Sequence, residues 1–118
     1  MSGVVVGLQH DRQKAALVAS ALRKHFSSVV TASSVDEVRR AATGCRIAAS
    51  VLDLEMVSFD EIERLKSKFD FPVVCTHRLA NDKMWVLAVR AGAEDCCYDD
   101  DVAAICRAIP GQAAAAAA

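Results

Sequence analysis

The sequence predicts an α/β fold in which five parallel strands alternate with five helices. Short apolar runs of the strand type recur along the chain, stretches with apolar residues at helical spacing lie between them, and the connections are short. Such connections join parallel strands through right-handed crossovers, so helices are expected on both faces of the sheet. The chain has 118 residues, of which 53% are apolar, and this suits one domain with a buried core.

The first strand and helix are indicated by two different patterns. Val4-Val5-Val6 is a continuous β-branched run, which is typical of a strand buried on both faces. Asp11 is suited to accept hydrogen bonds from the free N–H groups of a helix start, and apolar spacing carries this helix to about His25. A second short strand is predicted at Val29-Val30-Thr31.

The central strand follows the second helix. Ser34-Val-Asp-Glu37 has the spacing of a capping box, in which the Ser and Glu side chains each accept from the other residue's N–H, and Gly44 is expected to end that helix. Ile47 to Leu52 then predicts a buried strand that delivers the carboxylate of Asp53 to its C-terminal end. Ligands of open α/β sheets bind at these strand ends, so Asp53 is the first candidate site residue.

The third and fourth helices also carry start and stop signals. Ser58-Phe-Asp-Glu61 predicts a second capping box. Pro72 is placed to begin a fourth strand, Val73-Val74-Cys75. Asn81 is a predicted N-cap, and Gly92 is expected to end the helix that Asn81 begins.

The last unit completes a (βα)5 arrangement. A short strand is predicted at Asp95 to Tyr98, and Asp99-Asp100-Asp101 places acids at the start of a final helix, which Pro110 ends. We expect a three-layer, flavodoxin-like fold with strand order 2-1-3-4-5 and one domain at residues 1–110. The Ala-rich tail, residues 111–118, is expected to lie outside the domain as an appended or unassigned segment.

Composition excludes several classes of function. The 14 basic and 15 acidic residues give a net charge of -1, which lacks the basic footprint of a nucleic-acid-binding protein. No apolar run is long enough for a membrane span, and no signal peptide is recognisable, so we expect a cytoplasmic protein without direct membrane contact. Zinc-type Cys pairs are absent, and the scattered cysteines are expected to be core residues; they are Cys45, Cys75, Cys96, Cys97 and Cys106.

Two motifs on this frame resemble the receiver domain of two-component response regulators (CheY-like). Val51-Leu-Asp53-Leu-Glu-Met56 resembles the segment around the phospho-accepting Asp, and Ala91-Gly-Ala-Glu-Asp95 resembles the Ala-Gly-Ala motif that leads into the fifth strand. The resemblance covers residues 3 to 109. It implies that Asp53 is the phospho-acceptor position. It also implies an acidic pair for Mg²⁺ after the first strand, a Ser or Thr after the fourth and a Lys after the fifth.

The chain departs from the receiver pattern at each of these partner positions. Gln9 and His10 fall where the acidic pair is expected, or Leu8 and Gln9 if the register shifts by one residue, and Asp11 is the nearest acid. Asp99 falls at the Lys position.

The hydroxyl position depends on the register of the fourth strand. It falls on His77 if Pro72 is the anchor, and on Thr76 if the strand start shifts by one residue.

We therefore expect an atypical receiver, or pseudo-receiver, that acts through protein–protein interaction without the usual Mg²⁺-dependent phosphorylation. We expect no enzymatic activity and no cofactor. The implied partner is a sensor kinase or an output domain. A homodimer is also possible through the surface of the helix after Asn81, the strand 95–98 and the last helix, with Trp85 and Tyr98 as candidate contact residues.

Two alternatives remain open at this point. The chain can be a phospho-accepting regulator with a rearranged, Mg²⁺-binding site built from Asp53, Asp11 and Thr76. It can also be a metal- or redox-responsive switch that uses His10, His77 and the cysteines, because imidazoles with the Asp53 carboxylate suit a transition metal better than magnesium.

Overall fold

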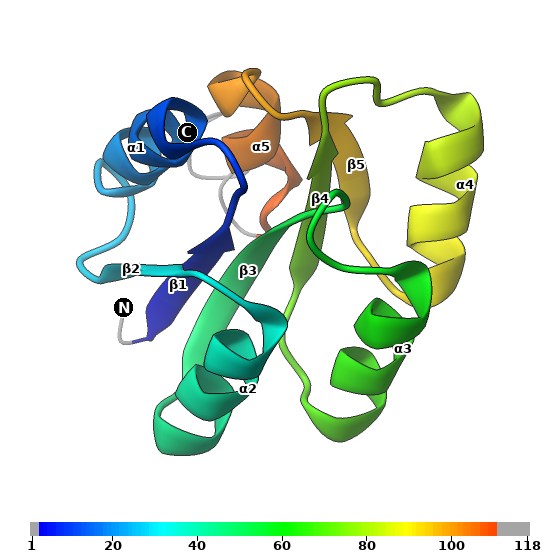
Figure 1. The fold of residues 1–118 in the computed structure, drawn as a ribbon. Helices are drawn as coiled ribbons and strands as arrows, with labels where there is room; N and C mark the ends of the chain where they lie inside the picture. Colours follow the sequence, from blue (N-terminus) through cyan, green and yellow to red (C-terminus); the bar gives the residue numbers. More distant parts are fainter. Residues whose placement is uncertain (1–2, 111–118) are drawn as a thin grey trace.

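A computed structural model describes residues 3–110, which form a sheet between two layers of helices (Figure 1). The sheet has five parallel strands in the order β2-β1-β3-β4-β5, as predicted. The strands are β1 (Val4–Leu8), β2 (Val29–Ala32), β3 (Ile47–Asp53), β4 (Val73–His77) and β5 (Asp95–Tyr98). The helices are α1 (Arg12–Leu22), α2 (Val35–Gly44), α3 (Phe59–Lys68), α4 (Asp82–Ala91) and α5 (Val102–Ala108).

The helices divide between the two faces of the sheet and give two separate apolar cores (Figure 1). α1 and α5 cover one face, where Leu22 and Ile105 pack on Val51 of the central strand. α2, α3 and α4 cover the other face, where Ile62 packs in the cluster that contains Leu52. Successive residues of β3 therefore face opposite cores, so this strand is buried on both faces and its C-terminal end is fixed between them.

The predicted helix caps form with one correction. Ser58 and Glu61 complete a capping box at the start of α3. At α2 the box is only half formed: Ser34 Oγ accepts from the N–H of Glu37 at 3.2 Å, but the Glu37 carboxylate accepts from the N–H of Ser33 instead of Ser34.

The other helix ends and strand ends are close to prediction. Asn81 caps α4, and Gly92 ends it with φ of 111°, a left-handed conformation that favours glycine. α1 ends at Leu22, earlier than the predicted end near His25, because a turn follows it. β4 continues to His77, beyond the predicted Cys75, because its last residues still pair with β5.

The predicted tail, residues 111–118, lies outside the described residues. Within the described part of the chain, no helix is both long enough and apolar enough to cross a membrane.

Candidate functional site

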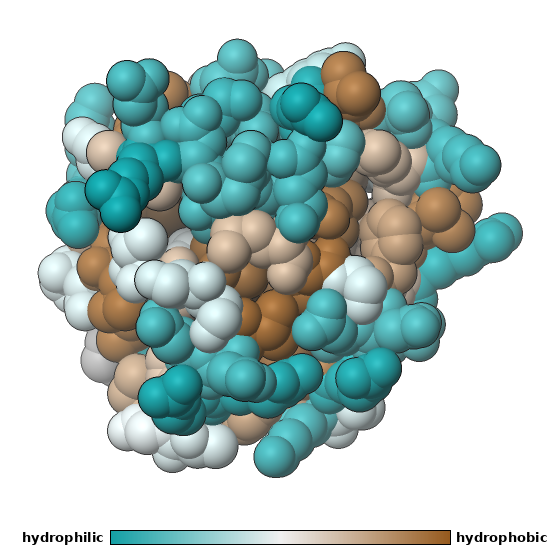
Figure 2. Space-filling view, viewed as in Figure 1, coloured by the Kyte–Doolittle hydropathy of each residue, from teal (hydrophilic) through white to brown (hydrophobic). Residues whose placement is uncertain are grey.

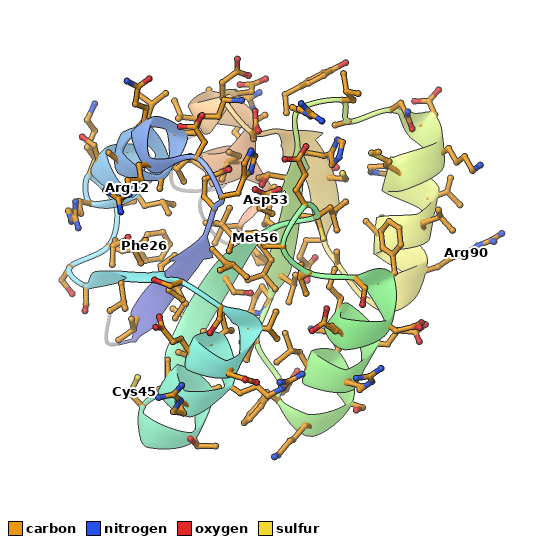
Figure 3. All side chains as sticks on the ribbon, viewed as in Figure 1. Arg12, Phe26, Cys45, Asp53, Met56 and Arg90 are labelled. Carbon is orange, nitrogen blue, oxygen red and sulfur yellow. The ribbon has the colours of Figure 1, made fainter. Side chains whose placement is uncertain are left out.

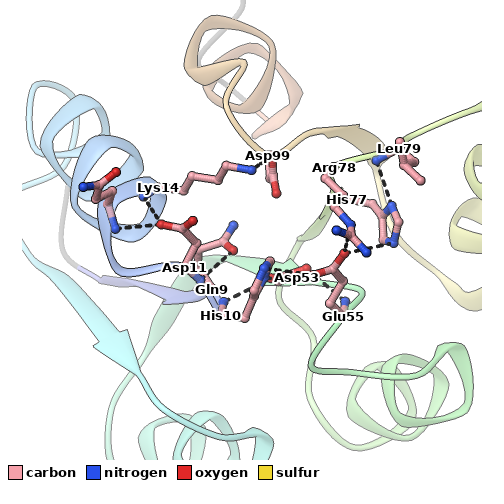
Figure 4. Close-up of polar contacts among 11 residues, drawn as sticks. Gln9, His10, Asp11, Lys14, Asp53, Glu55, His77, Arg78, Leu79 and Asp99 are labelled. Carbon is pink, nitrogen blue, oxygen red and sulfur yellow. Dashed lines mark hydrogen bonds and ion pairs between the residues drawn. The ribbon is translucent and has the colours of Figure 1, made fainter.

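The candidate site lies at the edge of the sheet where the central strands end. Asp53 is the last residue of β3, and the pairing of β3 with β4 places it opposite Thr76. Figure 3 labels Asp53 at the C-terminal end of β3 and Cys45 at the end of α2, just before β3 begins. The segment between β1 and α1 passes over the same edge and brings His10 to Asp53 (Figure 4).

The Asp53 carboxylate is completely buried, and both of its oxygens accept hydrogen bonds. Its Oδ1 accepts from the N–H of Glu55 at 2.9 Å, and its Oδ2 accepts from the N–H of His10 at 3.1 Å. Oδ2 also contacts Nδ1 of the His10 ring. Burying a carboxylate is costly unless hydrogen bonds or opposite charge compensate it, and here the β1–α1 segment supplies both.

The His10 ring lies between two carboxylates. Its Nδ1 faces Asp53, and its Nε2 lies 2.9 Å from Oε2 of Glu55. The hydrogen bond with Asp53 and the negative charges of Asp53 and Glu55 raise the pKa of His10, against a smaller opposing effect of burial. Glu55 is held in turn by Arg78, whose Nε lies 2.6 Å from Oε1 (Figure 4). The result is a chain of alternating charges from the buried strand end to the surface.

Gln9 and Asp11 turn away from Asp53. The Gln9 side-chain oxygen accepts from the N–H of Asp11 at 3.2 Å. Oδ1 of Asp11 accepts from the N–H groups of Gln13 and Lys14 and caps α1, as its position in the sequence predicts. These hydrogen bonds, that from Lys14 first, lower the pKa of Asp11. Asp11 is therefore committed to the helix start.

A second buried carboxylate lies at the same edge of the sheet, directly after β5. Asp99 follows β5 and is 2% exposed, and its Oδ1 lies 2.9 Å from Nζ of Lys14 on α1. The hydrogen bond with Asp99 raises the pKa of Lys14. Oδ2 of Asp99 has no hydrogen-bond partner among the described residues, so Lys14 carries most of the compensation for this acid.

The register of β4 separates Thr76 from His77. Thr76 pairs directly with Asp53, and paired residues of a parallel sheet share a face; its hydroxyl is buried without a hydrogen-bond partner in residues 3–110. His77 belongs to the Glu55 side: its Nε2 lies 3.6 Å from Oε1 of Glu55, and its Nδ1 accepts from the N–H of Leu79 at 2.9 Å.

The remaining candidates lie away from this cluster. Trp85 and Tyr98 are about half exposed on α4 and β5. Burial raises the pKa of the Cys96 thiol to about 11 and that of the Cys97 thiol to about 12, and it also raises the pKa of Cys75. Protonated thiols are poor nucleophiles and poor metal ligands, so these three cysteines behave as core residues.

No family model matches this chain, and no curated protein matches its sequence. Solved structures do match it. A response regulator from Thermotoga maritima is 20% identical with a TM-score of 0.80, over 92% of this chain and 98% of that chain. A Burkholderia pseudomallei response regulator with a phosphorylated aspartic acid, calcium ion and citrate is 19% identical with a TM-score of 0.79, over 98% of this chain and 71% of that chain.

The chain has the receiver-domain fold. NtrX from Brucella abortus, in complex with ADP, matches as well, at 20% identity and a TM-score of 0.78. That match covers 99% of this chain but 28% of NtrX, so the fold occurs there as one part of a longer protein.

The residues at this receiver edge do not fit the Mg²⁺ site that the fold implies. Mg²⁺ requires a near-octahedral set of oxygen ligands and keeps several waters. Here the position beside Asp53 holds the imidazole of His10, while the Gln9 side-chain oxygen and Oδ1 of Asp11 accept from backbone N–H groups. At the Lys position of the receiver pattern, Asp99 places a further negative charge.

Three residues of this network were not among the candidates predicted from the sequence. Glu55 and Arg78 form the outer part of the charge chain, and Lys14 neutralises Asp99. Glu55 stands two residues beyond Asp53, so it was open to prediction from position alone. The pairing of Lys14 with Asp99 joins residues 85 positions apart and depends on α1 packing beside α5, which no local pattern reveals.

The His10–Asp53 contact predicts a pH dependence of stability. Because the pKa of His10 is raised above 6.5 in the folded protein, its contribution is fully present below pH 6.5 and is lost as pH rises through the raised value. The difference in free energy of unfolding between the wild type and His10→Gln is therefore expected to decrease over this pH range. Urea titrations in the presence of a metal chelator measure this difference. His25→Gln, at an exposed histidine outside the site, is the matched control substitution. A constant difference for His10→Gln contradicts the pairing.

The Lys14–Asp99 pair predicts non-additive effects on stability. Lys14→Met is expected to destabilise the fold because it leaves a buried carboxylate without a cation. Asp99→Asn is expected to be less harmful, or stabilising, when combined with Lys14→Met, and the coupling is obtained from urea unfolding of the double-mutant cycle. Lys83→Met, on the exposed start of α4, is the matched control with little expected effect. Additive effects at Lys14 and Asp99 contradict the pair.

Proposed function

We propose that this chain is an atypical receiver module that signals through protein–protein contacts and without the Mg²⁺-dependent phosphorylation of Asp53. One observation carries the proposal: both oxygens of Asp53 already accept hydrogen bonds, and one of them contacts the His10 ring. A carboxylate that accepts a phosphoryl group needs a free oxygen for attack and a metal ion that offsets charge on the incoming group.

The charges around Asp53 also oppose a phosphoryl group. Glu55 and Asp99 bring two further carboxylates to the same edge of the sheet, and Lys14 is engaged with Asp99. Arg78 is likewise engaged with Glu55. A phosphorylated Asp53 therefore gains no lysine at the end of β5 that could pair with the phosphoryl oxygens.

Partners are proposed by analogy with the matching structures. These are response regulators, and NtrX carries the receiver fold as part of a longer chain. We take a sensor kinase or an output domain as the partner class for this chain, and we assign it no enzymatic activity of its own. A regulator that accepts a phosphoryl group on Asp53 is the competing function.

Phosphorylation chemistry tests the proposal directly. The protein is incubated with Mg²⁺ and acetyl phosphate, or with beryllofluoride, and followed by intact mass and by amide NMR shifts. We expect no mass gain and no shifts around Asp53, because its Oδ2 is held by His10 and its Oδ1 by the N–H of Glu55. Asp53→Ala is the control for non-specific acylation. Stoichiometric modification that disappears in Asp53→Ala establishes the competing function.

The surface of α4 and β5 supports a role in protein contacts. Four apolar residues on α4 are more than a third exposed, and apolar (brown) atoms gather over this helix in Figure 2; these residues are Trp85, Val86, Leu87 and Val89. Leu87 belongs here although its spacing in the sequence predicts the core side. β5 is an edge strand with unpaired backbone groups on one side, and Tyr98 extends the apolar surface along it. Trp and Tyr are favoured anchors of protein interfaces.

A second copy of the chain is the occupant that we propose for this surface. Sedimentation velocity is expected to show concentration-dependent self-association that Trp85→Ala weakens, because the substitution removes a large exposed anchor. Leu17→Ala, at an equally exposed apolar residue on α1, is the matched control and should leave association unchanged. A monomer at all concentrations, or equal weakening by Leu17→Ala, contradicts self-association through this face.

A further inference from the structure

We propose that His10 and Glu55 bind a divalent transition-metal ion of the zinc class, with Asp53 as the carboxylate that orients the His10 ring, in place of the Mg²⁺ site that the receiver fold implies. One donor atom from each of the three side chains lies within 4.8 Å of the other two. The site goes beyond the interaction role proposed above, because metal binding and signalling contacts involve different surfaces.

The three side chains are oriented before any ion arrives. Asp53 is oriented by the backbone N–H groups of His10 and Glu55, and its contact with Nδ1 sets the plane of the His10 ring. Nε2 of that ring then faces the Glu55 carboxylate at 2.9 Å. Metal-binding histidines characteristically hold a carboxylate on one ring nitrogen and the metal on the other. Preorganised donors lose little conformational entropy on binding.

The donor set selects the metal. An imidazole nitrogen with carboxylate oxygens suits Zn²⁺, Co²⁺ or Ni²⁺, whereas Mg²⁺ prefers oxygen ligands alone. The His10 side chain is 40% exposed and that of Glu55 is 20% exposed, so an ion can enter from solvent and water can complete its coordination.

Two neighbours complete the surroundings without joining the ligand set. Arg78 holds Oε1 of Glu55 and leaves Oε2 directed at His10. His77 accepts the N–H of Leu79 on its Nδ1, so a neutral His77 carries its proton on Nε2, the nitrogen that faces Glu55. Nε2 of His77 therefore presents a proton rather than a lone pair toward Glu55, and His77 does not join the ligand set.

The cysteines are the main competitors for a zinc-class ion. The buried thiols have raised pKa values and stay protonated at neutral pH. Cys45 is exposed and lies just before β3 begins, whereas Asp53 ends that strand (Figure 3). A Cys45→Ser background removes this competitor without touching the proposed site.

The experiment uses the metal alone as the probe. Zn²⁺ is titrated by calorimetry into the chelator-treated Cys45→Ser protein, and thermal unfolding is followed with Zn²⁺ and with excess Mg²⁺. We expect one Zn²⁺ per chain and a higher Tm with Zn²⁺ only. His10→Gln and Glu55→Gln should each weaken Zn²⁺ binding by about tenfold or more. Co²⁺ should give visible absorption of a nitrogen–oxygen site, without thiolate charge-transfer bands.

Matched variants decide the outcome. His25→Gln removes the exposed histidine outside the site and should keep the parent affinity. Glu55→Gln retains the hydrogen bonds of His10 to Asp53, so it tests the site even if His10→Gln disturbs folding, which circular dichroism checks. Absence of Zn²⁺ binding, parent affinity in Glu55→Gln, or equal stabilisation by Mg²⁺ overturns the proposal. None of these results depends on whether Asp53 accepts a phosphoryl group.

Discussion

The buried carboxylate of Asp53 is the constraint on which the rest of the site depends. It ends the central strand between two apolar cores, where an unpaired charge is not tolerated, and breaking a buried ion pair typically costs about 3–5 kcal/mol. His10 compensates the Asp53 carboxylate in two ways: its backbone N–H donates to Oδ2, and its ring contacts the same oxygen. The other nitrogen of the ring faces outward, and the Glu55 carboxylate lies against it. The series of ionisable side chains at this edge therefore begins at the buried Asp53 carboxylate and extends to the surface.

A single short segment compensates both buried acids. His10 lies just before α1 and contacts Asp53, while Lys14 lies in the first turn of α1 and reaches Asp99 beyond β5. Asp11, between them, caps the helix and fixes the direction of that turn. The start of α1 is thereby tied to the ends of β3 and β5. Relative to the receiver pattern, the charges are exchanged: cations stand on the β1–α1 side and an acid stands after β5.

The fold was predictable from sequence because it rests on local patterns that repeat along the chain. The apolar run to Leu52, the capping box at Ser58 and the glycine after α4 each define an element boundary without knowledge of its neighbours. The site was predictable only at the positions that the strand ends define. The partners of those positions come from other elements, and their choice depends on side-chain direction. Register decided that Thr76, and not His77, shares the face of Asp53.

The group that lies beside Asp53, a metal ion or the His10 ring, determines which chemistry this edge of the sheet can support. A metal ion can leave or exchange, and it polarises a phosphoryl oxygen while leaving a carboxylate oxygen free to attack. The His10 ring is tethered to the chain and takes up the carboxylate oxygen itself. The same ring adds a nitrogen donor to a group that otherwise offers only oxygens, which moves the preference of the cluster from Mg²⁺ toward zinc-class ions. In the function and the metal site that we propose, His10 alone accounts for both the unreactive aspartate and the choice of ion beside it.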